Sequence, residues 1–449
     1  MPASRDIKPE QVRGFEEAFR ADPRNRLARN AATVNPLNKI VQNRESVIAS
    51  EHTFSHLIEG LPITNQKKSG RCWMFAGLNL FRLEAAKNLK LKEFELSQAY
   101  LMFFDKLEKA NYFLENILET ADEPLGSRLF MHLMNAPIPD AGQWDMFVNL
   151  VRKYGVIPKV IMPETESSST TWPMNKVLSA KLREYAAELR KMHKKGSSEG
   201  DLRTRKSKML EVVYRMLAIH MGEPPSAFNW QWRDKDNKFH RDGVITPHEF
   251  YEKYVKFDMD STACLINCPT QDKPFNKMYT IEYLGNMVGG DIIRYLNVDI
   301  DTFKKAAVNM IADGKPVWFG CDVGKMIDRD AGILNDQLYD YGLLYNTEFK
   351  ADKVERVDYG HSVMTHAMVL TGVDLDEDNK PVKWRVENSW GDKVGDKGYF
   401  VMSDAWFEGY TYEIAVEKKY LSKELLEVLE TEPVRLPPWD PMGALAFTP

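Results

Sequence analysis

The sequence has few cysteines, no long apolar run and little net charge. Its four cysteines, Cys72, Cys264, Cys268 and Cys321, are too few among 449 residues for a scaffold held by disulfides, and they are typical of a reducing compartment. No stretch approaches the roughly 18 consecutive apolar residues that a membrane-spanning helix needs. The polar N-terminus lacks the apolar segment and small-residue cleavage site of a secretory signal. We therefore expect a cytoplasmic protein with no membrane partner.

The near balance of charges narrows the range of partners. The chain has 60 Lys and Arg against 65 Asp and Glu, a formal net charge of −5, which argues against a protein that binds nucleic acid through its overall charge. One segment departs from this balance, because residues 181–208 contain ten Lys or Arg and four Asp or Glu. A pair of solvated helices explains such a segment. The alternative is a basic surface that attracts nucleic acid.

Apolar residues make up 43% of the chain and aromatic residues 11%, enough to form a core in two or three structural units. Helix-like spacing of apolar residues predicts helices in 72–89, 97–117 and 175–220, the last with a glycine-containing break at 196–200. After residue 300, short β-rich runs bounded by turn residues predict strands at 316–323, 366–373 and 383–388. Early helices and late strands predict an α+β fold with two lobes.

Cys72 is the first candidate for chemistry, because it lies at the start of the predicted helix 72–89 and just after Ser69 and Gly70. The positive end of a helix dipole lowers the pKa of a thiol and favours the nucleophilic thiolate. A single cysteine before an apolar helix is also commonly a buried packing residue. Whether Cys72 is a nucleophile or a packing residue therefore depends on which other side chains lie near it in the fold.

Three further residues have the chemistry that a cysteine nucleophile needs. Gln66 precedes the glycine turn, so its amide and the backbone N–H of Cys72 can donate to the oxyanion of a tetrahedral intermediate. His366 begins a predicted strand, where an imidazole can exchange a proton with the thiol. Asn388 follows the next strand and can fix the imidazole by a hydrogen bond that Trp390 shields from water. Taken singly, the three are also explained as a surface glutamine, a structural histidine and a turn-forming asparagine.

In this order, Gln66, Cys72-Trp73, His366-Ala367 and Asn388-Ser389-Trp390-Gly391 resemble the papain-like cysteine peptidases. The similarity is greatest to one branch, the bleomycin hydrolase or aminopeptidase C family. It extends over nearly the whole chain, with matching blocks at 97–112, 142–146, 154–159, 316–325 and 439–446. The resemblance implies four roles: Cys72 as nucleophile, His366 as general acid and base, Asn388 as the residue that orients it, and Gln66 as oxyanion donor.

The resemblance also implies a papain-like core with a helical lobe and an antiparallel β lobe, enlarged by large helical insertions. We accordingly divide the chain into an N-terminal arm with helices (1–60), a helical lobe with the nucleophile helix (61–120), mostly helical insertions (121–300), a β lobe with His366 and Asn388 (301–430), and an extended C-terminal arm in the cleft (431–449). Secreted papain relatives commonly have a cysteine shortly before the nucleophile. Ser69 and Gly70 stand there instead, which favours the cytosolic branch.

In that branch the subunits form a homohexamer with inward-facing active sites, and the C-terminal arm lies in the substrate cleft. Such an arm blocks longer peptides, and its carboxylate can bind the free amino group of a peptide substrate. The resemblance therefore implies a cytosolic thiol aminopeptidase of broad specificity. It would hydrolyse N-terminal residues through a thioester acyl-enzyme and need no metal or cofactor.

This chain departs from the family at its end, because Phe447, Thr448 and Pro449 follow Ala446, where the familiar arm stops. One hypothesis is that the enzyme removes these residues itself and so creates a carboxylate at Ala446 that binds substrate. Another is that the longer arm shifts this anchor or permits some endopeptidase activity. A third is that the three residues form an inert tail.

Two other functions stay open beside the aminopeptidase. One is a thiol endopeptidase of the same fold, and the other is a nucleic-acid-binding or scaffolding hexamer that uses the basic segment 181–208. The remaining cysteines do not indicate a metal site, because Cys264 and Cys268 are followed by no second pair at zinc-site spacing. Cys321 lies in an apolar strand and is expected to be a small core residue.

Overall fold

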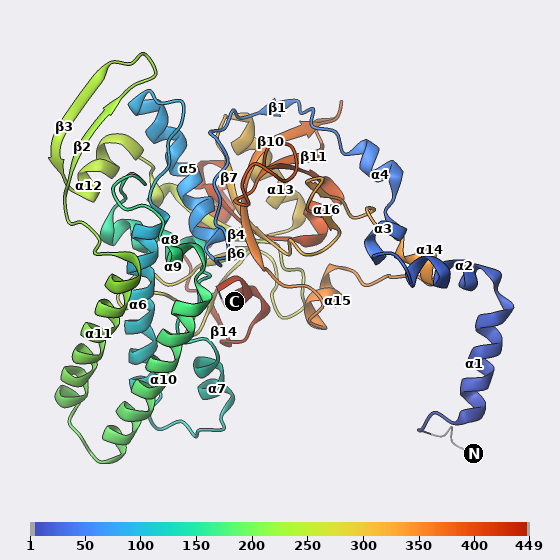
Figure 1. Ribbon diagram of the computed structural model, residues 1–449, viewed down its shortest axis with the longest axis horizontal. Coiled ribbons are helices and arrows are strands. Elements are labelled where there is room, and N and C mark those ends of the chain that lie inside the picture. The colour runs from blue at the N-terminus through green and yellow to red at the C-terminus, as the bar shows by residue number, and fades with distance from the viewer. Residues whose placement is uncertain (1–4, 447–449) are drawn as a thin grey trace.

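Helices gather on one side of the molecule and a large sheet on the other, and a helical N-terminal arm projects beyond the sheet (Figure 1). The computed structural model describes residues 5–446. Among these residues, no helix combines the length and hydropathy that crossing a membrane requires.

The first half of the chain is mainly helical. Its helices are α1 (Pro9–Ala21), α2 (Pro23–Ala32), α3 (Leu37–Val41), α4 (Arg44–Ala49), α5 (Cys72–Leu89), α6 (Gln98–Glu119), α7 (Arg128–Asn135), α8 (Trp144–Tyr154), α9 (Glu166–Ser169), α10 (Trp172–Lys194) and α11 (Glu199–Met221). The later helices are α12 (Pro247–Phe250), α13 (Ile300–Ala312), α14 (Tyr341–Tyr345), α15 (Lys353–Asp358), α16 (Asp404–Tyr410) and α17 (Lys423–Leu429). Shorter turns are the π-helical η1 (Tyr251–Val255) and the 3-10 helices η2 (Met259–Ser261), η3 (Lys418–Tyr420) and η4 (Pro441–Ala446).

One mixed sheet organises the second half of the chain. In spatial order it runs β14 (Val434–Leu436), β5 (Lys277–Ile281), β6 (Tyr295–Asn297), β4 (Thr262–Ile266), β13 (Thr411–Glu417), β7 (Val317–Cys321), β10 (His366–Leu375), β11 (Pro381–Glu387), β12 (Tyr399–Ser403), β9 (Ile333–Leu334) and β8 (Ile327–Asp328), and β1 (His56–Leu57) also pairs with β10. A separate hairpin joins β2 (Phe228–Arg233) and β3 (Phe239–Ile245). The central strands are antiparallel, as expected for the β lobe.

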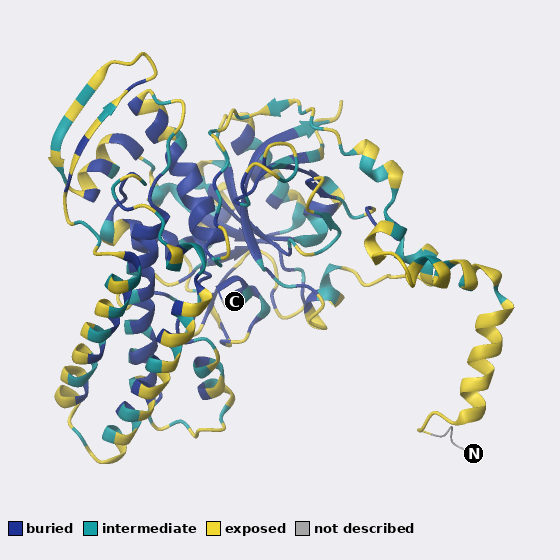
Figure 2. Cartoon of the chain, in the orientation of Figure 1, coloured by how far each residue is buried: buried dark blue, intermediate teal, exposed yellow. Residues whose placement is uncertain are grey.

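Helix α5 is the central element that positions the site. Most of its residues are buried, because it is apolar on nearly every side and lies between the sheet and the other helices (Figure 2). It contacts β10 and β7 on one side and α6 and α8 on the other. At Gly77 the ring of Phe147 in α8 approaches so closely that an added Cβ would lie 2.7 Å from it. Helix α5 is therefore packed closely against both the sheet and α8.

The predicted helices and strands agree closely with the structure. The helix predicted over 72–89 is α5 with the same bounds, and the helix predicted over 97–117 is α6, which begins where the Ser97 side chain accepts from the Tyr100 N–H. The predicted break at 196–200 falls between α10 and α11. The three predicted strands are β7, β10 and β11.

Two segments differ from their sequence-based descriptions. Residues 121–300, expected to be mostly helical, also contribute β4, β5 and β6 to the sheet. Strand β4 is a short apolar run buried on both faces, so it lacks the alternation that identifies a strand. The C-terminal arm, expected to be extended, is extended only in β14 and then turns as η4. Pro441 suits the first residue of that turn, where no N–H is needed.

The N-terminal arm has little contact with the body of the protein. Neither α1 nor α2 has a buried residue, and both project away from the sheet (Figures 1 and 2). The arm meets the body at α14, which α2 and α3 contact, and again where Asn43 N–H donates to the Leu338 carbonyl at 2.9 Å and Val41 is buried.

Candidate active site

The loop before α5 is fixed by buried ionic contacts. Arg71, the residue before the helix, is 1% exposed and forms a bidentate pair with Glu164, with nitrogen–oxygen distances of 2.9 and 2.7 Å. The Gly70 N–H donates to Asp140 Oδ2 at 3.1 Å. Asp140 in turn accepts from Lys106 Nζ at 2.6 Å. These contacts hold the loop so that Cys72 occupies the first position of α5.

Cys72 is buried, with 3% of its surface exposed. Burial raises the pKa of its thiol to about 11, and the backbone N–H groups of Ala367, Trp73 and Cys72 itself oppose this rise. The expectation of a lowered thiol pKa at the helix N-terminus is therefore not met, because the loss of solvation outweighs the dipole. The contribution of the Ala367 N–H also places the sulfur beside the residue that follows His366.

His366 begins β10 and is held by Asn388, which follows β11. Its Nε2 lies 2.9 Å from Asn388 Oδ1, and the same oxygen accepts from the Ser389 N–H at 2.8 Å. Because Oδ1 is an acceptor, Nε2 carries the proton and Nδ1 keeps a lone pair. Burial lowers the pKa of His366 to about 4; the bond to Asn388 opposes this, and the charge of Arg329 adds to it. The imidazole is thus a neutral base with Nδ1 as its basic atom.

Trp390 covers this hydrogen-bonded pair. Its ring centroid is 5.0 Å from that of His366, with the planes inclined by 36°. Asn388 is fully buried, so water does not compete for its bond to the imidazole. The role of Trp390 as a shield stays a prediction.

Gln66 is held by the segment that contains Asn388. Its backbone N–H donates to the Ser389 carbonyl at 2.8 Å, and its side-chain Oε1 accepts from Ser389 Oγ at 2.6 Å. Its Nε2 donates to the Ser69 carbonyl at 2.6 Å. An amide nitrogen has two hydrogens, so one stays available for a substrate oxygen. Ser389 lies in the recognised motif, but the sequence gives no signal that its hydroxyl holds Gln66.

The four candidate residues therefore come together at the junction of α5 and the sheet. Gln66 and Cys72 come from the helical side, while His366 and Asn388 come from adjacent antiparallel strands. The junction has a thiol, a base, an orienting acceptor and an amide donor, which are the groups needed for acyl transfer through a covalent intermediate.

The C-terminal arm is docked beside this junction. Strand β14 pairs with β5, and Lys273 Nζ lies 3.0 Å from Asp440 Oδ2 in a buried ion pair. The guanidinium carbon of Arg128 lies 3.9 Å from the ring centroid of Trp439. The side chain of Leu445 reaches Gly320 of β7, where an added Cβ would lie 3.5 Å from it.

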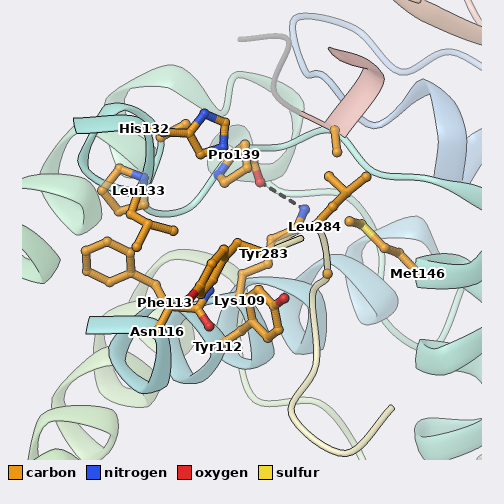
Figure 3. A pocket seen from close by; sticks show the side chains of 14 residues that line it. Lys109, Tyr112, Phe113, Asn116, His132, Leu133, Pro139, Met146, Tyr283 and Leu284 are labelled. Carbon is orange, nitrogen blue, oxygen red and sulfur yellow. Dashed lines mark hydrogen bonds between the residues drawn. The ribbon is translucent and has the colours of Figure 1, made fainter. Parts of the chain in front are cut away.

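Ala446 is the last described residue and lines a small pocket with Lys109, His132 and Tyr283, among others (Figure 3). Lys109 Nζ donates to the Pro139 and Ala141 carbonyls at 3.1 and 2.6 Å, and its ammonium lies 5.2 Å from the Trp73 ring centroid. Residues 447–449, on which the trimming hypothesis depends, lie outside the described part of the chain.

Cys264, Cys268 and Cys321 are buried, and within residues 5–446 no group of three or more His, Cys, Asp or Glu side chains is arranged to hold a metal ion.

In the basic segment 181–208, most cations contact protein acceptors rather than forming an open surface. The paired residues are Lys181, Arg183, Arg190, Arg203, Arg205, Lys206 and Lys208. Arg203 and Lys206, for example, share Glu115 of α6. Most of the basic side chains of this segment therefore take part in contacts within the protein, and the choice between a solvated helix pair and a surface for nucleic acid stays a prediction.

Known proteins of similar sequence match this chain over nearly its whole length. Residues 6–443 match the Peptidase C1-like family. An aminopeptidase C from Listeria innocua is 47% identical over 444 residues, which cover 99% of this chain and 100% of that protein. A bleomycin hydrolase from Homo sapiens is 45% identical over 453 residues, with 99% of this chain and 100% of that protein covered.

A solved structure has the same architecture. The crystal structure of PepW from Lactobacillus rhamnosis HN001 superposes with a TM-score of 0.97 at 48% sequence identity, and the match covers 98% of this chain and 99% of that one. The similarity therefore includes the N-terminal and C-terminal arms and the helical insertions as well as the two lobes.

Proposed function

The chain belongs to the Peptidase C1-like family, the papain-like cysteine peptidases, and we propose that Cys72 and His366 carry out its aminopeptidase reaction. It is a cysteine aminopeptidase similar to aminopeptidase C and bleomycin hydrolase. The observation that best supports the assignment of roles is the bond of 2.9 Å between His366 Nε2 and Asn388 Oδ1 beside a buried thiol at a helix start. This bond leaves Nδ1 as the base for the Cys72 proton.

In the first step, Cys72 Sγ attacks the carbonyl carbon of the scissile peptide bond as its proton passes to His366. Burial favours the neutral thiol and the neutral imidazole taken singly, whereas the transfer creates two opposite charges side by side that attract each other. The carbonyl oxygen becomes an oxyanion. The backbone N–H of Cys72 and the remaining N–H of Gln66 Nε2 stabilise it.

In the second step, the tetrahedral intermediate collapses and the carbon–nitrogen bond breaks. His366 returns the proton to the departing amine, which leaves a thioester on Cys72. Water then attacks the thioester carbonyl carbon while His366 takes a proton from it; the carbon–sulfur bond breaks, the amino acid is released, and His366 returns the proton to Cys72 Sγ. Asn388 holds the imidazole in one orientation throughout, which keeps Nδ1 directed at the reacting atoms.

The docked arm supports cleavage counted from the N-terminus. Leu445 and Ala446 are buried against the body of the protein, which supports the proposal that this part of the arm occupies space that a longer peptide would need. A time course with free and N-acetylated forms of one peptide tests this, with product masses read at each point. Successive loss of single residues from the free peptide alone is expected, and equal internal cleavage of both would favour an endopeptidase.

We also propose that Ala446 supplies the substrate anchor after removal of Phe447, Thr448 and Pro449. The buried position of Ala446 supports this, because a carboxylate there would lie at the end of the docked arm. The intact mass of the purified protein tests the idea. A species that keeps Pro449 and still has full aminopeptidase activity would exclude trimming as a requirement.

A homohexamer in the cytoplasm is the proposed state of the enzyme. The N-terminal arm supports self-association, because Val12, Phe15 and Phe19 lie on one face of α1 and are 43%, 63% and 41% exposed. Four free cysteines and no disulfide support a reducing compartment. Native mass measurement of the full chain and of a chain lacking α1 tests the assembly, and a monomer in both would contradict it.

A further inference from the structure

A cation lies against the indole that covers the proposed general base. The guanidinium carbon of Arg329 is 4.0 Å from the ring centroid of Trp390, and the imidazole of His366 is 5.0 Å from the same indole, centroid to centroid. Arg329 is also close enough for its charge to lower the pKa of His366, after the larger effect of burial. The guanidinium is therefore part of the surroundings of the reacting atoms.

The positive charge of Arg329 is not neutralised by an ion pair within the described part of the chain. Arg329 is exposed in the turn between β8 and β9, and across residues 5–446 no carboxylate forms an ion pair with it. The neighbouring Asp328 binds other donors instead of Arg329: its carboxylate accepts hydrogen bonds from the N–H groups of Asp330 and Ala331 and from Gln42 Nε2. Stacking on Trp390 holds the guanidinium in place while leaving its N–H donors free for a ligand.

The chemistry of the site says which part of a substrate comes near Arg329. His366 must protonate the departing amine, so the new N-terminus of the released peptide forms beside the imidazole. The docked arm, by contrast, limits the side that holds the N-terminal residue. Residues that follow the scissile bond therefore extend from the imidazole toward Trp390 and its surroundings.

We propose that Arg329 forms an anion-binding subsite for the departing peptide, and that it binds a carboxylate located one or two residues after the scissile bond. This inference rests on the proposed function of Cys72 and His366. Two sources provide the same chemistry: an Asp or Glu side chain, or the terminal carboxylate of a di- or tripeptide. A planar guanidinium binds either through paired hydrogen bonds.

The test uses four peptides with one N-terminal leucine: Leu-Ala-Ala amide, the same tripeptide as free acid, Leu-Glu-Ala amide and Leu-Lys-Ala amide. For the wild-type enzyme, kcat/KM relative to the neutral amide is expected to be about three- to tenfold higher for at least one anionic peptide, the range for a charged contact at a partly solvated site. The Lys peptide is expected to be poorer than the neutral one. A higher kcat/KM for the free acid would identify the terminal carboxylate as the ligand of Arg329, and a higher kcat/KM for the Glu peptide would identify an acidic side chain.

The variant Arg329→Gln is expected to bring the ratio of anionic to neutral peptide close to one, mainly through KM, and Arg329→Glu is expected to invert it. Arg241→Gln is the matched control, because Arg241 is also exposed and stacked, 5.2 Å from the Phe239 ring centroid on the β2–β3 hairpin. It is expected to keep the wild-type ratio.

Three results separate the possible failures. A wild-type ratio near one, or a ratio that Arg329→Gln leaves unchanged, would overturn the subsite. An equal loss on all four peptides in Arg329→Gln would assign the residue to supporting Trp390 and would also overturn it. No release of leucine from even the neutral amide by the wild-type enzyme would instead overturn the proposed function.

Discussion

Ser389 Oγ donates a hydrogen bond of 2.6 Å to Gln66 Oε1, and so joins two residues that are 323 positions apart. The two backbones are joined as well, since the Gln66 N–H donates to the Ser389 carbonyl at 2.8 Å. Ser389 directly follows Asn388, whose oxygen holds the imidazole. One short segment thus sets the positions of both the base and the proposed oxyanion donor.

Ser389→Ala is expected to lower kcat by about tenfold, because loss of one hydrogen bond lets the Gln66 amide rotate. Gln66→Ala removes the donor itself and is expected to lower kcat more, by roughly 10²–10³-fold. Steady-state kinetics of both variants and of the double variant measure this. If Ser389 acts through Gln66, its substitution has little further effect in the Gln66→Ala background, whereas fully additive losses would contradict the connection.

Cys72→Ala is expected to abolish turnover while leaving the fold intact. The change removes one sulfur atom from the start of a helix that packing holds on all sides, so the free energy of unfolding should change by only about 1 kcal/mol. Residual leucine release and the thermal unfolding midpoint check the two parts. Turnover at more than a few per cent of the wild-type rate would show that another group is the nucleophile.

The buried state of His366 predicts a specific dependence of stability on pH. Its pKa is lowered to about 4 in the folded protein, against about 6.5 in an unfolded chain. Between these values the unfolded chain binds a proton that the folded protein does not, so acidification from pH 6.5 to 4 favours unfolding by up to about 3 kcal/mol. The variant His366→Gln has no imidazole at this position, so it lacks this pH-dependent contribution to the free energy of unfolding. Urea unfolding of both proteins at pH 7 and 4.5 should show the larger loss in the wild type, and parallel losses would contradict the shift.

Much of the fold could be predicted from the sequence because local patterns determine it. Helix α5 is marked by a glycine turn and an apolar run, and β10 and β11 by short β-rich runs between turns. The roles of Cys72, His366, Asn388 and Gln66 could be proposed because each has its own chemistry and their order matches a known family. The hydrogen bond from His366 to Asn388 then follows from adjacent strands.

The remaining features depend on contacts between distant segments, which local patterns do not contain. The position of Cys72 at a helix start predicts a low thiol pKa, but burial of the thiol raises the pKa instead. In the sequence Arg329 has no feature that distinguishes it from other turn residues. Its contact with Trp390 is seen only in the folded structure. Lys273 and Asp440 are separated in sequence by the whole of the β lobe, and docking of the arm brings them together.

The ion pair between Lys273 and Asp440 is the main buried charge contact of the C-terminal arm. The two side chains are 3% and 4% exposed, and their nitrogen–oxygen distance is 3.0 Å. The other carboxylate oxygen of Asp440 accepts from the Met442 N–H at 2.9 Å, which begins the turn of η4. Lys273 also contacts Asp272 at 2.7 Å, so it keeps one partner if Asp440 is changed.

Asp440→Asn is therefore expected to loosen the arm without unfolding the protein, because it keeps the size and the Met442 acceptor but removes the attraction to Lys273. If the arm restricts the cleft, cleavage of an N-acetylated peptide should rise by about fivefold or more, the change that roughly 1 kcal/mol of lost docking gives. Carboxypeptidase should also digest the arm faster. Arg435→Gln is the control, because Arg435 is an exposed cation on the same arm. Faster digestion with no gain in internal cleavage would show that the arm does not set the exopeptidase specificity.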